Sequence, residues 1–338
     1  MPTFVYPSNS ELKQVEQVKL PVLTAADPIF SILPMVDVDS HILSWEQQDN
    51  YQGLQQVRGL NGQPGKVKKV GGKRYLVEPG VYGEFKTIDE LELTTRRQWG
   101  TFNAPINISD LVMESQDHLL NRRLDRIRYI GWTLLTTGTF SVSNADGSIT
   151  HTDTFPLQTY TAGTLWSTTA TATPIANLRA IKLLGRGKSV SFGSGARLFM
   201  NQTDVNNLLN NTNANDLFGR RVAGLTTINS LSVLNQILMG DDLPQIEVYD
   251  EGYEDETGTF QLFIPAGKAT LVGRRTNGAT IGDYAMTRNA NNPNLEAGAY
   301  TKVTDNSDED VPRMIGVHDG HNGGPRLYFP SAVIAMNI

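Results

Sequence analysis

The chain has 338 residues, with 29 Lys and Arg against 35 Asp and Glu, a net charge of −6 and no cysteine. This composition excludes a disulfide framework, a cysteine-ligated metal site and a thiol nucleophile. The mild acidity argues against a protein that coats nucleic acid with a basic face. Hydrophobic residues make up 39% of the sequence, enough for a packed core, and no apolar run approaches the roughly 20 residues that span a bilayer. The N-terminal segment lacks the pattern of a signal peptide.

Residues 1–45 are predicted to form an arm. Pro21, Pro28 and Pro34 interrupt short apolar clusters. Because each proline removes a backbone donor and fixes φ, we expect no long helix to pass through this stretch. Its apolar residues need a surface to lie on, either in the core of this chain or on a neighbouring subunit.

Residues 46–88 predict a long β-hairpin. The pieces Gln55–Leu60 and Lys73–Glu78 flank a Gly- and Lys-rich centre, Asn61–Gly72. A two-stranded ribbon is marginally stable alone in water, so this hairpin needs support. An inter-subunit loop and an ordinary surface hairpin both fit the pattern.

Residues 109–136 predict the longest helix. Its apolar residues recur with a period near 3.6, Ser109 is a suitable N-cap, and Gly138 is a suitable stop. Asp125 precedes Arg128 by three residues, the spacing of an ion pair on a helix. About 28 residues at roughly 1.5 Å each give a rod of about 42 Å, long enough to act as a spine for other elements.

The second half predicts short strands and helices in alternation. A hairpin is expected from Thr139–Ser143 and Ser148–Asp153, with a turn at residues 144–147. Residues 276–325 are expected to be largely loop. The other predicted elements are helices over Ile175–Leu184, Thr203–Asn210 and Leu225–Met239, strands over Ala196–Met200, Ala269–Arg274 and Arg326–Ile338, and a hairpin from Gln245–Asp250 and Thr259–Pro265.

Few residues in the sequence suggest chemistry. Gly185–Ser189 resembles the end of a phosphate-binding loop, but Lys182 stands where that loop needs glycine, so a helix C-cap explains it better. His318, Asp319 and His321 offer potential metal ligands, although their glycine-rich surroundings favour a turn. The acidic runs at residues 247–256 and 305–310 fit solvated loops. We therefore predict no enzyme, no metal and no cofactor, and favour a structural or assembly protein.

The order of the parts carries a family resemblance. Asp27–Phe30, Arg122–Gly138 and the stretch from Val248 to Gly273, which includes Phe263–Lys268, follow one another as in the lambda-like capsid protein E family of tailed bacteriophages. The resemblance implies an α+β protein with the Hong Kong 97-type capsid fold. Residues 276–325 match nothing in it.

The resemblance also implies a division of the chain into parts. These are an N-terminal arm at 1–45, an extended loop at 46–88, a peripheral domain at 89–190 with a spine helix at about 109–136, an axial domain at 191–325, and a C-terminal strand at 326–338.

The function that the resemblance implies is that of a major capsid protein. Its copies would form hexamers and pentamers of an icosahedral shell that encloses double-stranded DNA without sequence-specific binding. The implied partners are further copies and scaffolding, portal and decoration proteins, with no membrane, in a virion assembled in the host bacterial cytoplasm. An encapsulin-like compartment shell, a tail-tube protein and a virion-associated β-rich binding protein remain alternatives.

The basic residues of the loop tip and the spine helix are candidate inter-subunit contacts. Some relatives crosslink a loop lysine to a neighbouring asparagine through a glutamate, but lambda-like members generally rely on decoration proteins, so we expect no crosslink. The candidates are Lys66, Lys68, Lys69, Lys73, Arg74, Arg122 and Arg126.

Overall fold

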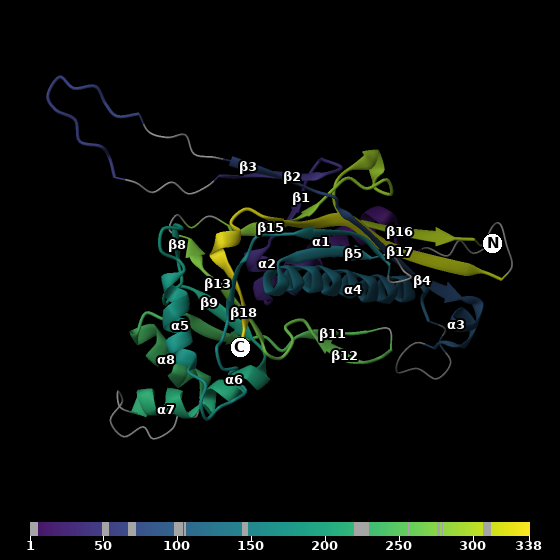
Figure 1. Ribbon diagram of the computed structural model, residues 1–338. Helices are drawn as coiled ribbons and strands as arrows, with labels where there is room; N and C mark the ends of the chain where they lie inside the picture. Colours follow the sequence, from purple (N-terminus) through teal and green to yellow (C-terminus); the bar gives the residue numbers. More distant parts are fainter. Residues whose placement is uncertain are drawn as a thin grey trace. The chain divides into compact units, whose positions relative to one another are not determined.

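The chain forms two compact units, each assembled from three stretches of sequence. The first unit holds residues 1–43, 77–131 and 283–326, and the second holds 44–76, 132–282 and 327–338. The computed structural model (Figure 1) describes residues 6–48, 54–66, 72–97, 104, 106–143, 148–219, 230–255, 257–275, 278, 280–306 and 312–338.

A mixed sheet built around one long strand is the centre of the first unit. Its strand order is β1-β15-β17-β16, and β4 also pairs with β17. The short β1 runs parallel to β15, whereas β16 and β4 run antiparallel to β17. The strands are β1 (Met35–Asp37), β4 (Gly80–Asp89), β15 (Gly282–Met286), β16 (Tyr300–Asp305) and β17 (Met314–Leu327).

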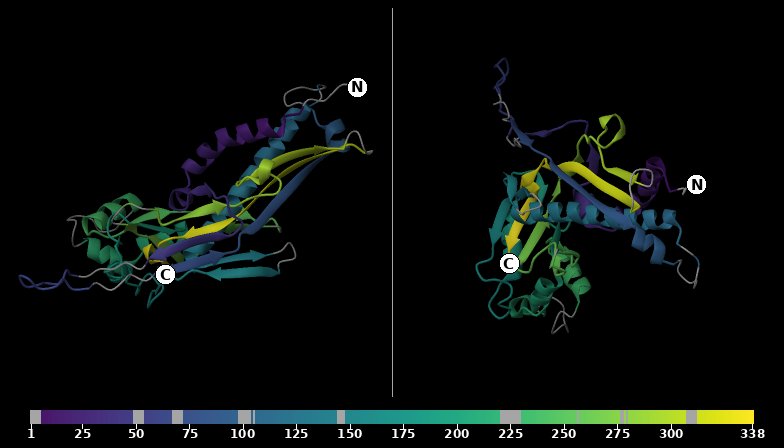
Figure 2. Two further views of the ribbon diagram at one scale, coloured as in Figure 1. Left: turned by 90° about the horizontal axis from the view of Figure 1, so that it is seen from above. Right: turned by 90° about the vertical axis from the view of Figure 1, so that its right-hand side faces the viewer.

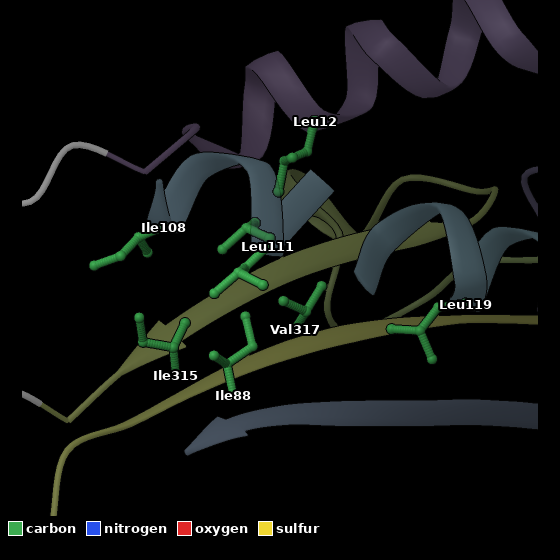
Figure 3. Close-up of a cluster of buried hydrophobic side chains, with 8 residues drawn as sticks. Leu12, Ile88, Ile108, Leu111, Leu119, Ile315 and Val317 are labelled. Carbon is green, nitrogen blue, oxygen red and sulfur yellow. The ribbon is translucent and has the colours of Figure 1, made fainter. Parts of the chain in front are cut away.

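Helices cover one face of this sheet. They are α1 (Asn9–Ala25), α2 (Pro28–Ile32), α3 (Glu90–Thr95) and the long α4 (Ile108–Thr137), whose C-terminal end continues into the second unit. Figure 2 shows α1 running beside α4 and the sheet. The buried side chains between these elements come from α1, α4, β4 and β17 (Figure 3): Leu12, Ile88, Ile108, Leu111, Val112, Leu119, Ile315 and Val317.

Local signals at both ends define α4 and confirm the predicted spine helix. Asn107 begins it: its side-chain oxygen accepts the N–H of Ser109 at 3.2 Å and its carbonyl accepts the N–H of Leu111. Asn107 is therefore the cap, in place of the predicted Ser109. Gly138 ends it with φ of 76°, the left-handed conformation that glycine adopts without a Cβ penalty. Although α4 is 30 residues long, neither it nor another described helix has a stretch apolar enough to cross a membrane.

Replacing Gly138 with alanine should destabilise the protein by about 1–2 kcal/mol. The positive φ disfavours any L side chain, and an added Cβ would lie 3.0 Å from the carbonyl oxygen of Phe155. Urea denaturation of Gly138→Ala measures the cost. Gly163→Ala is the matched control, because its Cβ would meet no atom within 4 Å. Equal free energies of unfolding for the two variants would show that Gly138 does not need its special conformation.

A five-stranded sheet forms the core of the second unit. Its order is β10-β9-β13-β18-β7. Trp132, on the last turns of α4, is completely buried, with its ring 5.2 Å from that of Phe199 and 4.6 Å from that of Tyr249. The strands are β7 (Gln158–Thr161), β9 (Arg197–Met200), β10 (Gln245–Val248), β13 (Lys268–Val272) and β18 (Val333–Asn337).

Helices and small two-stranded sheets complete the second unit. The helices are α5 (Pro174–Leu183), α6 (Gln202–Leu209), α7 (Thr212–Gly219), α8 (Leu231–Gly240) and the 3₁₀ turn η2 (Pro330–Ala332), and a second 3₁₀ turn, η1 (Pro293–Leu295), belongs to the first unit. The small sheets pair β2 (Leu43–Gln48) with β3 (Gly72–Val77), β5 (Thr139–Ser143) with β6 (Ile149–Thr154), β8 (Val190–Ser191) with β14 (Arg274–Arg275), and β11 (Gly252–Glu254) with β12 (Phe260–Leu262).

The expectation that no long helix passes through residues 1–45 is wrong. The helix α1 has 17 residues and contains Pro21. A capping box starts it: the hydroxyl oxygen of Ser8 accepts the backbone N–H of Glu11, and the carboxylate of Glu11 accepts the backbone N–H of Ser8. Pro21 is exposed, so only one intrahelical bond is lost and the ring meets no packed neighbour.

The predicted hairpin at residues 46–88 exists with a different first strand. β3 lies where Lys73–Glu78 was predicted, but its partner is β2, at Leu43–Gln48, and Gln55–Leu60 has no regular structure. Trp45 explains the choice: its ring is buried, stacks on Tyr75 at 5.4 Å, and its indole N–H donates to the carbonyl of Leu327. The apolar residues at positions 43 and 45 alternate with a polar one, and this pattern could have predicted a strand there.

The largest error concerns residues 276–325, which are not mainly loop. They contain β15, β16 and most of the 14-residue β17. The glycines of β17 remove the alternating apolar pattern by which a strand is recognised in a sequence. An added Cβ at Gly320 would lie 2.5 Å from the carbonyl of Tyr82, and one at Gly323 would lie 2.6 Å from that of Ala285. Because neighbouring strands approach so closely, β17 has glycine where a strand pattern normally shows apolar residues.

A strand pairing and the assignment of one segment also differ from the predictions. β10, predicted as half of a hairpin, instead runs parallel to β9, and the hairpin is formed by β11 and β12. Residues 283–326, assigned by resemblance to the axial domain with 191–282, lie in the first unit because β15 and β17 pair with β1 and β4. The predicted hairpin of β5 and β6 and the predicted helices α5 and α6 are confirmed within a residue or two, while its turn at residues 144–147 lies outside the described residues.

Candidate assembly surfaces

The segment between β2 and β3 exposes three large apolar side chains. Leu54, Val57 and Leu60 are 99%, 99% and 103% exposed, as much as in an extended peptide. All of residues 54–66 are exposed and have no helix or strand. Clustered exposed apolar side chains are typical of interaction surfaces.

The predicted basic residues of this loop are solvent-facing where they can be described. Lys66 is exposed beside the apolar segment, and Lys73 and Arg74 are exposed on β3. Lys68 and Lys69 lie outside the described residues. The described members therefore place cationic side chains next to the exposed apolar ones, which suits contact with an acidic rim on a partner.

The two predicted arginines of the spine helix are engaged within the first unit. Arg122 donates to the carboxylate of Glu84 on β4, with 2.8 Å between Nη2 and Oε1, and this hydrogen bond lowers the pKa of Glu84. The guanidinium of Arg126 lies 5.9 Å from the ring centre of Tyr82. Both arginines are also exposed, so they can still meet a neighbour.

Arg122 borders an open groove between α4 and β4. The groove has a volume of about 520 Å³ and is lined by seven residues of the first unit. Val81 and Phe85 are exposed on the same strand, which pairs with β17 alone in the part of the chain that the structure describes. An unpaired strand edge with exposed apolar side chains is a surface that can accept another chain. The lining residues are Gly83, Glu84, Phe85, Lys86, His118, Leu119 and Arg122.

The sequence analysis missed a buried charge cluster centred on Arg123. Its side chain is 3% exposed, and its guanidinium contacts the carboxylate of Asp319 on β17 at 3.0 Å and that of Glu16 on α1. The hydroxyl of Thr301 on β16 donates to both carboxylates, at 3.3 and 3.2 Å. Burial raises the pKa of Asp319 to about 6, Arg123 opposes this rise and Glu16 adds to it. No local pattern could reveal this cluster, because its members are up to 303 positions apart.

The potential metal ligands near residue 320 lie on a strand and not in the predicted turn. His318 stacks on Phe85 at 5.4 Å, Asp319 pairs with Arg123, and the buried Nε2 of His321 is 2.9 Å from the hydroxyl of Tyr284. Each therefore has a packing or hydrogen-bonding role. Within the described residues, no three His, Cys, Asp or Glu side chains gather closely enough to hold a metal ion.

His321 should make stability fall in acid. Burial lowers its pKa from 6.5 to about 3. The unfolded chain therefore takes up this proton first, and the stability that neutral His321 provides is present above pH 6.5 and lost as the pH falls toward 3. Between pH 7.5 and 5 this amounts to roughly 2 kcal/mol.

The variant His321→Gln isolates this effect, because glutamine still offers an acceptor to Tyr284 and does not titrate. The free energy of unfolding of the variant minus that of the natural chain should increase by about 2 kcal/mol when the pH is lowered from 7.5 to 5. Urea denaturation at the two pH values measures it. His118→Gln, at an exposed position of the same unit, is the control. A relative stability of His321→Gln that stays constant would mean that the imidazole is protonated in the folded chain.

The other sequence motifs have structural roles. Gly187 has φ of 77° in the turn after α5. Asp250 accepts the N–H of Gln202 at 2.9 Å at the start of α6, and Glu247 pairs with Arg197 at 3.1 Å. Two residues of the acidic run are thus engaged in contacts within the second unit.

Solved structures with the same fold are shell proteins and phage proteins. A prophage capsid protein of E. coli CFT073 matches with a TM-score of 0.55 and 16% identity over 79% of each chain. A phage-related protein of Bordetella bronchiseptica RB50 matches with a TM-score of 0.54 and 11% identity, over 91% of this chain and 90% of that one. The capsid of a native GTA particle matches with a TM-score of 0.51 and 12% identity, over 92% of this chain and 89% of that one. The mixed α+β fold is that of the Hong Kong 97-type capsid proteins, as predicted.

The family follows from the sequence profile of phage major capsid protein E, which matches residues 36–315. Because this match spans most of the chain, the chain belongs to the phage major capsid protein E family. The predicted function, a major capsid protein of a tailed phage, is thereby confirmed, and its place is the virion. A search among curated proteins finds no matching sequence.

Proposed function

We propose that copies of this chain assemble into hexamers and pentamers of an icosahedral shell that encloses a double-stranded DNA genome. The observation that carries the proposal is the full exposure of Leu54, Val57 and Leu60 in a segment without secondary structure. Apolar side chains of this kind gain stability only when another surface removes them from water. In a shell, the next subunit supplies that surface.

The loop at residues 46–88 is the element that we propose to lie on a neighbouring subunit. Together with the groove beside Arg122, it provides contacts on different parts of the chain. A closed shell needs such heterologous contacts, because each copy must offer one surface and receive another. Obligate contacts of this kind usually bury more than about 2,000 Å².

Further partners and the place of assembly follow from the same proposal. Scaffolding and portal proteins, and in some shells a decoration protein, would act with this chain in the cytoplasm of a host bacterium. The chain itself would act without catalysis or a cofactor. We expect no covalent crosslink through Lys66 or Lys73, so mature particles should release a monomer of unchanged mass on a denaturing gel.

Electron microscopy of the expressed 338-residue chain, alone and together with a scaffolding protein from the same source, tests the proposal. The expected result is shells with sixfold and fivefold capsomers. A compact monomer at high concentration under both conditions would contradict it. The contents of the particles decide between the alternatives, because a phage head packages DNA whereas an encapsulin-like shell packages an enzyme. The family match favours the phage head.

A further inference from the structure

Several polar contacts hold the helix α1 on the first unit. All 17 of its residues are described, and Leu12 is the only one that is fully buried. The polar contacts include an ion pair between Lys19 and Asp117 at 2.6 Å, hydrogen bonds to Gln116 and Val303, and the contact of Glu16 with Arg123. A helix of this length is marginal in isolation, so it depends on these contacts.

The helix that follows, α2, is anchored by buried apolar side chains. α2 has only five residues, yet Ile29 and Phe30 are buried, and Leu33 is buried directly after it. Asp27, between the two helices, pairs with Arg128 at 2.7 Å. Because this anchor lies immediately C-terminal to α1, the chain at Ala26–Asp27 can act as a hinge, and α1 can leave while α2 stays in place.

If α1 leaves, the buried charges on the rest of the first unit still have partners. Arg123 has two carboxylate partners, and only Glu16 belongs to α1. After release, Arg123 and Asp319 remain as a neutral pair. With α1 docked, two carboxylates share one guanidinium in a buried place, which leaves one negative charge in excess.

We propose that α1 is a detachable helix, and that its docking on the first unit is coupled to the uptake of a proton by the carboxylate of Asp319, which shares Arg123 with Glu16. This inference rests on the contacts of α1 and does not depend on the proposed shell. A proton removes the excess charge of the docked state, so acid favours docking and alkali favours release.

The groups around Asp319 act in both directions, and burial decides the balance. Burial, Glu16 on α1 and Glu84 on β4 favour protonation, whereas Arg123 on α4 and the hydrogen bond from Thr301 on β16 oppose it. Tyr300, on the same strand as Thr301, is neutral over this pH range, because burial raises its pKa further above 10. The docked pKa of Asp319 is about 6, and removal of Glu16 and rehydration would lower it toward 3.8. The docking equilibrium should then change by about tenfold between pH 8 and pH 5.

Hydrogen exchange of the full-length chain, read by mass spectrometry at pH 5 and pH 8 and corrected for intrinsic rates, tests the proposal. The natural chain is compared with Glu16→Gln and Asp319→Asn, and light scattering confirms one assembly state throughout. We expect peptides of α1 to open more often than those of α2 and α4, and to open about tenfold more often at pH 8 than at pH 5. Asp319→Asn should lose most of this pH dependence because the titrating carboxylate is gone. Glu16→Gln should lose most of it because Asp319 and Arg123 then form a neutral pair whether α1 is docked or released.

Asp117→Asn is the matched control. It removes the other ion pair of α1, which is half-exposed, so α1 should open more often while its pH dependence stays that of the natural chain. Peptides of α2 and α4 report in each variant whether the unit is folded. Protection of α1 equal to that of α2 at both pH values would overturn the proposal, and so would a tenfold pH dependence that persists in Asp319→Asn.

Discussion

The triple variant Leu54→Ser, Val57→Ser and Leu60→Ser should fold normally and fail to assemble. The three side chains are fully exposed in the single subunit, so their loss changes its stability by no more than about 0.5 kcal/mol each. In a shell, each would be worth about 1.5–3 kcal/mol of buried apolar surface. The loss of several kcal/mol per contact weakens association by a factor of 10³ or more, since about 1.4 kcal/mol is tenfold.

Sedimentation velocity and electron microscopy measure assembly, and urea denaturation measures the fold. Gln55→Ser with Gln63→Ser is the matched control, because both glutamines are exposed in the same segment and are polar already. The control should form shells with the yield of the natural chain. Normal shells from the triple variant would show that the apolar side chains of this segment are not at a contact, whereas an unfolded subunit would show that they support the fold.

Arg123→Met should be among the most destabilising single changes, at about 3–5 kcal/mol near pH 7.5. Methionine fills similar space but leaves the buried carboxylate of Asp319 without its counter-ion. The cost should shrink as the pH falls toward about 6, because without Arg123 the buried carboxyl of Asp319 is protonated at a higher pH than in the natural chain, and a protonated carboxyl needs no counter-ion. Below about 6 the group is protonated in both chains, so the cost should then stay constant. Urea denaturation between pH 5 and 7.5 measures both effects.

Arg122 supplies the control for this experiment. It is the adjacent residue on the same helix and also pairs with a carboxylate, that of Glu84, but both side chains are about half-exposed. Arg122→Met should therefore cost no more than about 1 kcal/mol at any pH. The double variant Arg123→Met with Asp319→Asn should recover part of the loss. Similar costs for the two single variants would contradict a buried, counter-ion role for Arg123.

Predictions from the sequence succeeded where the structure is set by neighbours along the chain. The α4 spine follows from a 3.6-residue apolar period, and Asp125 and Arg128 form the predicted ion pair at 2.7 Å. Pro174 opens α5, and Gly138 closes α4 with a positive φ. Each of these features depends on residues within a few positions of one another, so the local pattern is sufficient.

Predictions failed where distant segments determine the outcome. β17 is a strand because β4, β15 and β16 surround it, and its glycines fit the space that they leave. α1 forms across a proline because Leu12 and Glu16 meet α4. The pairing of β2 with β3, and the parallel pairing of β10 with β9, are likewise decided by contacts far apart in the sequence.

The candidate assembly surfaces also combine features that are local in the sequence with contacts between distant segments. The sequence indicated that the loop and the spine helix face a neighbour, and it ruled out thiol chemistry through the absence of cysteine. It could not show that Arg122 and Arg126 already have partners on β4, or that Arg123 lies between two carboxylates.

The sequence by itself determined the long helix α4 and the other elements that depend on local patterns, because composition and local periodicity are properties of neighbouring residues. Only the tertiary structure decided which residues share an environment. Burial is what raises the pKa of Asp319 and lowers that of His321, and burial results from packing between segments hundreds of residues apart. The uncovered apolar side chains of residues 54–60 were visible only once the rest of the chain had taken its place.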